Sequence, residues 1–513
     1  MERFIERYKD RIIGTIAGFD RILFRGQILS ICHIGGMERF LSSQKILNKD
    51  FRRFAEMFTE RIKRHAEQIA EETGRPYRYL SSPSISKEGY VRELMANNPV
   101  DEGLICVLSC VEPCHSFGLR SDRESKHLLL NWELRKCQHY YFYYLDRDFG
   151  LMHVRLQSWF PFTIQVCVNG REWLARQMDR TGIKYTQVEN CFTEISDLKR
   201  AQAISDSLCE MKLAPVLSAF AKHVNPWLSK KANVVLHPYY WTIRQGEYAT
   251  DVLFRDRASL AEVYPALAHH AIEQFSCDDV MRFLGRRTNT RFSGECKSSL
   301  ERRIEGVRVK HWVEENSIKM YDKAGSVLRV ETTINNPKRF RVRRHVETSA
   351  GTVVKHLPMR KGIADLRRRV EISRAANGRY FEALAVVGER KPSRNILDDV
   401  NRRIELNGLS YRALRPITTP ESDLFRAVLR GENQLQGLRN EDLRRHLYPN
   451  SEHDEKARKK ASARTSRQLR LLRAHGLVFK VPKTYYYRAT KKGHEVMSTA
   501  LIFRETDFVL LAT

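Results

Sequence analysis

Residues 318–333 read IKMYDKAGSVLRVETT, two runs of alternating polar and apolar residues around Lys323-Ala324-Gly325. Alternation with a period of two is typical of β-strands. A glycine in so short a connection tolerates the positive φ of a tight turn. The stretch therefore predicts a hairpin with strands over 317–322 and 326–333, inside the most strand-like passage of the chain, residues 306–340.

The same alternation assigns the charged side chains to faces. It places Lys319 and Tyr321 on one face of the first strand and Asp322 on the other. Arg329 and Glu331 share a face of the second strand. Asp322 and Glu331 therefore meet only if a bulge or the register brings both to one surface. If they meet, they form a site for Mg²⁺ or Mn²⁺ and a phosphodiester.

IKMYDK followed by LRVE resembles the YDK…RxE strands of replication-initiation proteins from rolling-circle plasmids and filamentous phages, over residues 310–336. The resemblance implies an acidic metal site on a sheet and a tyrosine that attacks DNA. It makes Asp322 and Glu331 metal ligands. The same stretch supplies three expected phosphate contacts: Lys310, Lys319 and Arg329.

The chain departs from that family because it is long and has no clear His-hydrophobic-His pair. The nearest approach, His153-Val154-Arg155, reads better as a phosphate contact made by Arg155. A tyrosine nucleophile is expected on a helix near the sheet. Tyr380, in RVEISRAANGRYFEAL, fits because four nearby arginines can lower its pKa: Arg368, Arg369, Arg374 and Arg379. The alternative is a core tyrosine with its hydroxyl satisfied.

Asp20, in GFDRILFRG, lies on an early apolar strand that resembles the first strand of RNase H-like nucleases. With Asp322 and Glu331 it would form a two-metal acidic cluster that activates water instead of a tyrosine. The alternative is a salt bridge from Asp20 to Arg21 or Arg25.

The charge of the chain is unevenly distributed. Its 513 residues hold 89 Lys and Arg against 61 Asp and Glu, a net charge of +28. Residues 338–513 hold 39 basic and 19 acidic residues, which is +20 of that surplus. A polyanion is the expected partner, because each neutralised phosphate releases counterions. DNA or structured RNA is favoured over an anionic membrane, since no broad apolar helix face accompanies the charge.

Residues 419–503 resemble the winged-helix DNA-binding domain of bacterial transcription regulators: three helices, a hairpin over Pro482-Lys483 and a closing helix. The third helix is predicted over 463–475, with Ser462 as its N-cap. The resemblance implies that this helix enters a major groove while Lys483 contacts the backbone. The arginines expected to face outward are Arg464, Arg467, Arg470 and Arg473. The alternative is a module used only for protein contacts.

The order of elements predicts an α/β, mixed-sheet multidomain protein with a C-terminal winged-helix domain. The expected parts are an α/β domain over 1–225 that resembles no named family, a mixed domain over 226–387, a linker over 388–416 and the winged helix over 417–513. Residues 226–291 are expected to be mostly helical, and no internal repeat is evident.

Several classes are excluded or disfavoured. No stretch approaches 18 uncharged apolar residues, and the charged start has no apolar signal core, so a cytoplasmic protein without a membrane partner is expected. Ten cysteines do not make a disulfide scaffold. The spacing of Cys106, Cys110 and Cys114 argues against zinc. No phosphate-binding loop or Gly-x-Gly-x-x-Gly is present, which gives nucleotide and dinucleotide cofactors no support.

Two functional hypotheses remain. The first is a metal-dependent DNA-processing protein of a mobile element, acting as an endonuclease, a strand-transfer enzyme or a tyrosine-type nickase. The second is a non-catalytic binder, either a winged-helix regulator or the protein component of a large-RNA ribonucleoprotein. The geometry of Asp322 and Glu331 decides between them.

Overall fold

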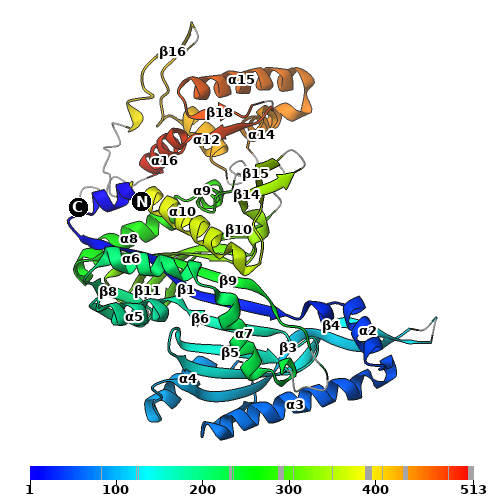
Figure 1. The fold of residues 1–513 in the computed structure, drawn as a ribbon. Helices are drawn as coiled ribbons and strands as arrows, with labels where there is room; N and C mark the ends of the chain where they lie inside the picture. The colour runs from blue at the N-terminus through cyan, green and yellow to red at the C-terminus, as the bar shows by residue number, and fades with distance from the viewer. Residues whose placement is uncertain are drawn as a thin grey trace. The chain divides into compact units, whose positions relative to one another are not determined.

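The computed structural model describes all residues except 83, 123, 125, 230–233, 235, 287–293, 304–305, 349–350, 388–395, 407, 431–436, 483 and 506–513. The chain folds into two compact units (Figure 1). The first unit comprises residues 1–268, 283–285 and 298–385. The second comprises residues 269–282, 286–297 and 386–513.

A single mixed sheet organises the first unit. It has 11 strands in the order β10-β11-β12-β13-β9-β1-β6-β5-β4-β3-β2. The strands are β1 Ile12–Gln27, β2 Tyr77–Leu80, β3 Gly103–Ser121, β4 Leu128–Asp146, β5 Gly150–Gln157, β6 Ile164–Asn169, β9 Tyr240–Phe254, β10 Cys296–Arg303, β11 Gly306–Val313, β12 Asn316–Lys323 and β13 Val327–Ile334. The β2–β3 pair is parallel, whereas β13, β9, β1 and β6 pair in antiparallel fashion.

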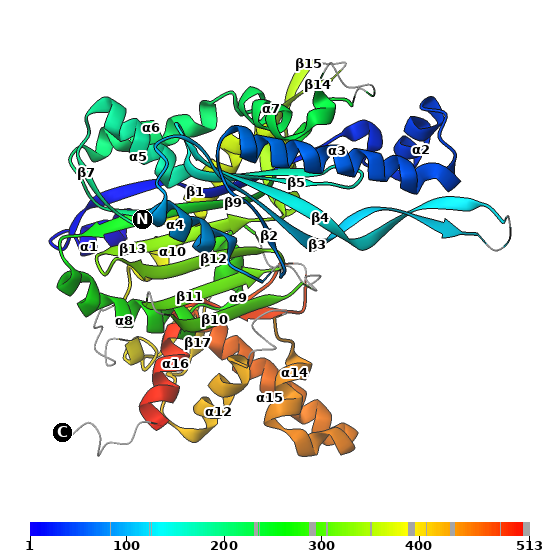
Figure 2. The ribbon, with the colours of Figure 1, turned by 90° about the horizontal axis from the view of Figure 1, so that it is seen from below.

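Helices and small hairpins surround this sheet. The helices are α1 Glu2–Arg7, α2 Ile34–Ser43, α3 Phe51–Glu72, α4 Lys87–Asn97, α5 Gly170–Thr181, α6 Leu198–Ser207, α7 Leu213–Val224, α8 Arg257–Glu273 and α10 Leu366–Leu384. The hairpins are β7 Tyr185–Val188 with β8 Cys191–Ile195, and β14 Arg341–Thr348 with β15 Gly351–Pro358. Strand β4 pairs with β5 only from His139 onward, so the β3–β4 ribbon continues beyond β5 (Figure 2).

Helix α10 covers one face of β9 and β13. Its Asn377 accepts a hydrogen bond of 2.7 Å from the Thr332 hydroxyl and donates one of 3.1 Å to the backbone carbonyl of Tyr248. Thr332 and Tyr248 are register partners in the β13–β9 pair. Side chains at the alternate positions of these strands therefore point to the opposite face.

A β-bulge in β1 controls which of its side chains reach that opposite face. Phe19 pairs with Tyr248 and Arg21 pairs with Glu247, so Asp20 is an extra residue opposite β9. A bulge of this kind interrupts the alternation of the strand. Asp20 and Arg21 consequently both belong to the face turned away from α10.

The predicted boundary at residues 225–226 is wrong, because β9 is an internal strand of the sheet that begins with β1. Residues 1–225 and 226–387 therefore contribute to one sheet. The expectation that residues 226–291 are mostly helical missed β9. The hairpin expectation is confirmed: β12 and β13 pair around Ala324 and Gly325, both at positive φ.

The second unit is built mainly of helices. Its elements are α9 Cys277–Phe283, β16 Ile404–Leu406, β17 Leu409–Tyr411, α12 Thr419–Val428, α14 Asn440–Leu447, α15 Glu455–Ala474, β18 Val478–Lys480, β19 Tyr487–Ala489 and α16 Lys491–Glu505. The linker expected over 388–416 lies partly outside the described residues. Its described part is not a free linker, because Leu397, Val400 and Leu414 are buried in the core of this unit.

Helix α6 seals the part of β1 that extends beyond the end of β6. The Gln202 side chain accepts a bond of 2.8 Å from the Ala17 N–H and donates one of 3.0 Å to the Ala17 carbonyl, as a neighbouring strand would. We predict that Gln202→Ala lowers the free energy of unfolding by about 1–3 kcal/mol, since the Ala17 N–H loses its partner and the Ala17 carbonyl keeps only the Ser205 hydroxyl. Urea denaturation measures this. Gln68→Ala on the exposed face of α3 is the matched control, and an equal loss in both variants contradicts the prediction.

Candidate metal centre

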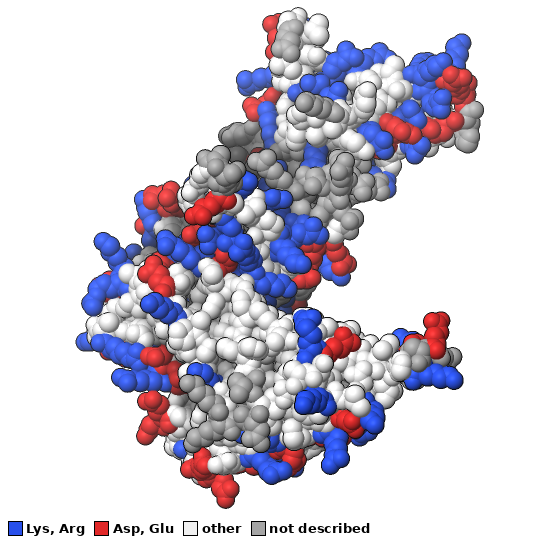
Figure 3. Space-filling model, turned by 45° about the vertical axis from the view of Figure 1, so that its right-hand side comes forward, with Lys and Arg blue, Asp and Glu red and all other residues white. Residues whose placement is uncertain are grey.

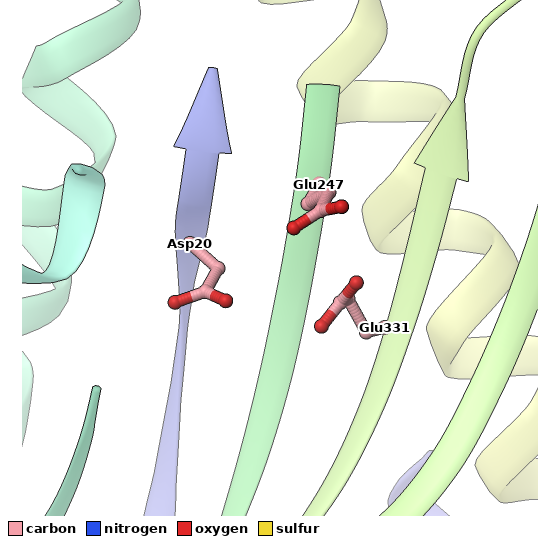
Figure 4. A group of neighbouring side chains, drawn as sticks. All are labelled: Asp20, Glu247 and Glu331. Carbon is pink, nitrogen blue, oxygen red and sulfur yellow. The ribbon is translucent and has the colours of Figure 1, made fainter. Parts of the chain in front are cut away.

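Three carboxylates come together on neighbouring strands, on the face turned away from α10. Asp20 belongs to β1, Glu247 to β9 and Glu331 to β13, and one oxygen of each lies within 4.8 Å of the others (Figure 4). The order β13-β9-β1 is the reason, since it makes three strands that are distant in sequence adjacent in space. In the described part of the chain, no other group of His, Cys, Asp and Glu meets the criterion of ligand atoms so close together.

Hydrogen bonds hold Glu331 in place. Lys319 Nζ lies 2.6 Å from its Oε1, and the Tyr321 hydroxyl donates to its Oε2 at 2.7 Å. Lys319 is the register partner of Glu331 across the hairpin. Both partners therefore reach the carboxylate from β12, as the alternation of that strand requires.

A buried ion-pair network lies beside the three carboxylates. Arg329 Nε and a terminal nitrogen bond both oxygens of Asp251, at 2.7 and 2.9 Å. Arg171 lies 3.0 Å from the same carboxylate. The other terminal nitrogen of Arg329 is 3.6 Å from Asp20 Oδ1. All four side chains are buried, so these cations act on the carboxylates through a low dielectric.

The carboxylates differ in proton affinity. Burial raises the pKa of Asp20, although the Arg329 charge opposes the shift. Burial and the neighbouring Glu331 raise the pKa of Glu247. Burial also disfavours ionised Glu331, but Lys319 and the Tyr321 hydroxyl outweigh it and hold the pKa of Glu331 below its usual range. Glu331 is thus the carboxylate that ionises most readily. Asp20 and Glu247 beside it keep their protons to higher pH.

This donor set fits a hard divalent cation. Mg²⁺ and Mn²⁺ prefer carboxylate oxygens, and an Mg–O distance of about 2.1 Å places opposite ligands about 4.2 Å apart. The separation of up to 4.8 Å requires only a small inward movement. A cation would also relieve the repulsion between the carboxylates that raises the pKa of Glu247.

Asp322 does not join this group. It is the register partner of Leu328, whereas Glu331 pairs with Lys319, so the β12–β13 alternation places the Asp322 carboxylate on the other face. Burial raises its pKa, and the Gly325 backbone and Arg257 are the groups that oppose the shift. The predicted cluster of Asp20, Asp322 and Glu331 is therefore wrong in one member. Taken alone, the opposite faces of Asp322 and Glu331 favour the non-catalytic binder over the enzyme. The carboxylate that does meet Asp20 and Glu331 is Glu247.

Tyr380 also lies away from the carboxylates, on α10. Its hydroxyl is 3.1 Å from His311 Nε2, and its ring packs against Phe283. Burial raises the pKa of Tyr380 well above its ordinary value, the reverse of the predicted effect of nearby arginines. Tyr380 is therefore a core tyrosine whose hydroxyl has a partner, the alternative that the sequence left open. The tyrosine beside the carboxylates is Tyr321.

Three of the phosphate contacts predicted in the first unit are engaged in internal ion pairs: Arg155, Arg329 and Lys319. Arg155 is largely buried and bonds Glu112 at 2.7 Å, and Arg329 is fully buried on Asp251. Lys310 and Lys319 are register partners, so both lie on the face of Glu331. Lys310 also stacks over Trp312 at 4.4 Å. Lys319 contacts Glu331 directly, and Lys310 lies next to Lys319 on β11.

The four arginines predicted to face outward, Arg464, Arg467, Arg470 and Arg473, are exposed. Helix α15 begins at Glu455, eight residues before the prediction, because Asp454 rather than Ser462 caps it by accepting bonds from the N–H groups of Lys456 and Ala457. Its exposed basic side chains are Lys456, Arg458, Lys459, Lys460, Arg464, Arg467, Arg470 and Arg473. Figure 3 shows many basic side chains over the region of α14 and α15. Lys483 lies outside the described residues.

Sequence reasoning missed Glu247. The signal was present in YWTIRQGEYATDVLF, residues 240–254, where Glu247 and Asp251 fall in one phase of the alternation and Tyr248, Thr250 and Val252 in the other. Charged residues at period two within such a strand indicate a polar site on one face. The register agrees with this reading, since Glu247 and Asp251 lie on the side of Arg329 and Glu331.

Comparisons with protein-family models, curated proteins and solved structures return no match for this chain. Among the helices that the structure describes, none combines the length and apolar character that a membrane crossing requires. The site is therefore interpreted from its own chemistry.

We predict that Mn²⁺ binds at this centre and that its affinity rises as the pH is raised. The raised pKa values of Asp20 and Glu247 mean that both must lose protons to become ligands, and a higher pH removes those protons. Calorimetric titrations in buffers of different ionisation enthalpy measure affinity and proton release together. Binding that does not depend on pH, or that survives in Glu247→Gln, contradicts the prediction.

Proposed function

We propose that this protein is a metal-dependent enzyme that cleaves phosphodiester bonds in nucleic acid, as part of the DNA processing of a mobile element. The observation that carries the proposal is the convergence of Asp20, Glu247 and Glu331 on three adjacent strands. Carboxylate-bound Mg²⁺ or Mn²⁺ can activate a water molecule and stabilise the negative charge that develops on the phosphate in the transition state. Lys310 and Lys319, on the same face, suit contacts to that phosphate.

Nucleic-acid binding is assigned to the second unit. Helix α15 carries eight exposed basic residues and one acidic residue, Glu455. Helices α12, α14 and α15 precede the β18–β19 hairpin and α16, the order expected of a winged helix. We infer a winged-helix domain in which α15 contacts the duplex. An arginine-bearing helix can read base edges as well as grip phosphates.

A tyrosine nucleophile is a second candidate mechanism. Tyr321 is on the face of the carboxylates, and its hydroxyl donates to Glu331 at 2.7 Å. Glu331 is thus placed to accept the proton if Tyr321 attacks a phosphate. Burial raises the pKa of Tyr321 well above its ordinary value, which favours water as the attacking group and Tyr321 as the residue that orients Glu331.

We predict that purified protein cleaves DNA or RNA only with a divalent cation. Glu247→Gln and Glu331→Gln each lower the cleavage rate by at least about 100-fold, because an amide removes the ligand charge without changing shape. Binding to nucleic acid is retained in both. Cleavage of a labelled oligonucleotide and a mobility-shift titration measure the two effects.

Asp322→Asn is the matched control for these variants, since it removes a carboxylate from the same hairpin on the other face. It is expected to cleave at the wild-type rate. Tyr321→Phe against Tyr380→Phe separates the nucleophiles: a covalent protein–DNA adduct that only Tyr321→Phe abolishes identifies a tyrosine. Binding with no cleavage in Mg²⁺ or Mn²⁺ supports the non-catalytic regulator or ribonucleoprotein component instead.

We predict that Arg467→Ala/Arg470→Ala weakens binding to duplex DNA and reduces the slope of log affinity against log salt by about 1.8, or about 0.9 for each phosphate that is no longer neutralised. Arg52→Ala/Arg64→Ala removes the same charge from α3 and serves as the control. Fluorescence anisotropy over a salt series gives both slopes. Equal slopes for the two double variants argue against α15 as the surface that binds the duplex.

A further inference from the structure

A cleft of about 900 Å³ opens beside the candidate metal centre, within the first unit. Its floor is the sheet face turned away from α10, and α4 and the β7–β8 turn line it too. Its lining includes Asp20, Arg21, Met95, Tyr143, His153 and Asn190. Asp20 belongs to both cleft and carboxylate group, so a ligand in the cleft lies beside the metal ligands.

Asn190 lies where the cleft meets the carboxylate group. Its side-chain amide donates to both oxygens of Asp20, each at 2.9 Å. Its own Oδ1 is buried and has no hydrogen-bond partner in the described structure. A buried acceptor without a partner costs about 1–3 kcal/mol, so its presence at a cleft wall indicates a ligand that donates a hydrogen bond.

Two uncharged rings, those of Tyr143 and His153, lie in the floor of the cleft with their planes tilted by 38°. The rings of Tyr143 and His153 are register partners with centroids 5.0 Å apart. Burial lowers the pKa of His153 to about 4, with Arg21 adding to the effect, so the imidazole is neutral at neutral pH. Met95 of α4 supplies an apolar, polarisable neighbour. Such a surface suits the π-face of a heterocyclic base.

The charges of the cleft exclude a ligand bound mainly through phosphates. Its acids outnumber its cations, and two of those cations are paired: Arg92 with Glu88 and Lys323 with Glu189, each at 2.8 Å. A phosphate is therefore favoured at Asp20, where a divalent cation is held and the third cation of the lining, Arg21, is the adjacent residue. A nucleotide that enters must place its base on the Tyr143–His153 floor and its phosphate at the metal centre.

We propose that the cleft binds one unpaired base of a single-stranded or locally melted nucleic acid, next to the phosphate that is cleaved. A paired base cannot reach the floor without leaving the stack, as in enzymes that extrude their target nucleotide. This inference rests on the proposed function, and it assigns that function a single-stranded substrate.

The test uses oligonucleotides that carry 2-aminopurine at one position, as DNA and as RNA, each single-stranded or annealed to its complement, with Ca²⁺ as the metal. Stacking on the floor quenches the fluorescence of the single strand. Met95→Trp fills the cleft from α4, and Glu93→Trp places the same ring on the exposed side of α4 as the matched control. Met95→Phe, with a smaller ring, is the second blocking variant, and circular dichroism verifies that each is folded.

We expect quenching in the wild type and in Glu93→Trp, lost in Met95→Trp and reduced in Met95→Phe. Cleavage of the single strand in Mg²⁺ falls about tenfold or more in Met95→Trp, as the loss of one stacked base implies. Binding of Mn²⁺ alone, measured by calorimetric titration, is unchanged in Met95→Trp. The DNA and RNA arms show which polymer is preferred.

Equal quenching and equal cleavage in Met95→Trp and Glu93→Trp overturn the cleft assignment and leave the nuclease proposal standing. Preference for the annealed duplex overturns it as well. Quenching that Met95→Trp abolishes, in a protein that cleaves with no metal, supports the cleft as a base-binding site and overturns the proposed function instead.

Discussion

The Arg329 guanidinium is the group on which the arrangement of the first unit's polar face depends. It bonds both oxygens of Asp251 on β9, donates to the Asn190 carbonyl at 2.7 Å and faces Asp20 on β1. One side chain thus links β13, β9, β1 and the β7–β8 turn. Removing one partner of a buried pair leaves an uncompensated charge, at a cost of about 3–5 kcal/mol. The network therefore fixes the register that brings the three carboxylates together.

The same network leaves the carboxylate group short of positive charge. Four buried or half-buried carboxylates face three buried or half-buried cations: Asp20, Glu247, Asp251 and Glu331 against Arg171, Lys319 and Arg329. Arg21, the register partner of Glu247, adds a fourth cation, but it is exposed to solvent. Arg171 and Arg329 form their ion pairs chiefly with Asp251, and Lys319 pairs with Glu331. Asp20 and Glu247 are left with the least compensation, which is why burial raises the pKa of both. A dication supplies the missing charge where the deficit lies.

Local pattern predicted much of this, and long-range pairing accounts for the rest. The alternation in residues 318–333 correctly placed Lys319 and Tyr321 on one face, and the outward arginines of α15 were likewise predicted. Asp20 and Glu331 were both singled out. Glu247 was not, because no short motif surrounds it and its segment was expected to be helical. Its role depends on β9 pairing between β1 and β13, which periodicity within one segment does not specify. Asp322 was predicted to be a metal ligand because of the family resemblance. The alternation of the strand, which correctly places Asp322 on the other face, argued against that prediction.

The bulge at Asp20 explains how one strand serves two sites. In the part of β1 before the bulge, even-numbered residues such as Gly18 lie on the face of Ala249 and Asp251. In the part after the bulge, odd-numbered residues such as Arg21 lie on that face. A regular strand would turn Arg21 away from Glu247 or turn Asp20 away from Glu331. Because the extra residue lies where β6 begins to pair with β1, the change of phase coincides with the edge of the cleft. Asp20 can therefore face the carboxylates of β9 and β13 while it also lines the cavity over β5 and β6.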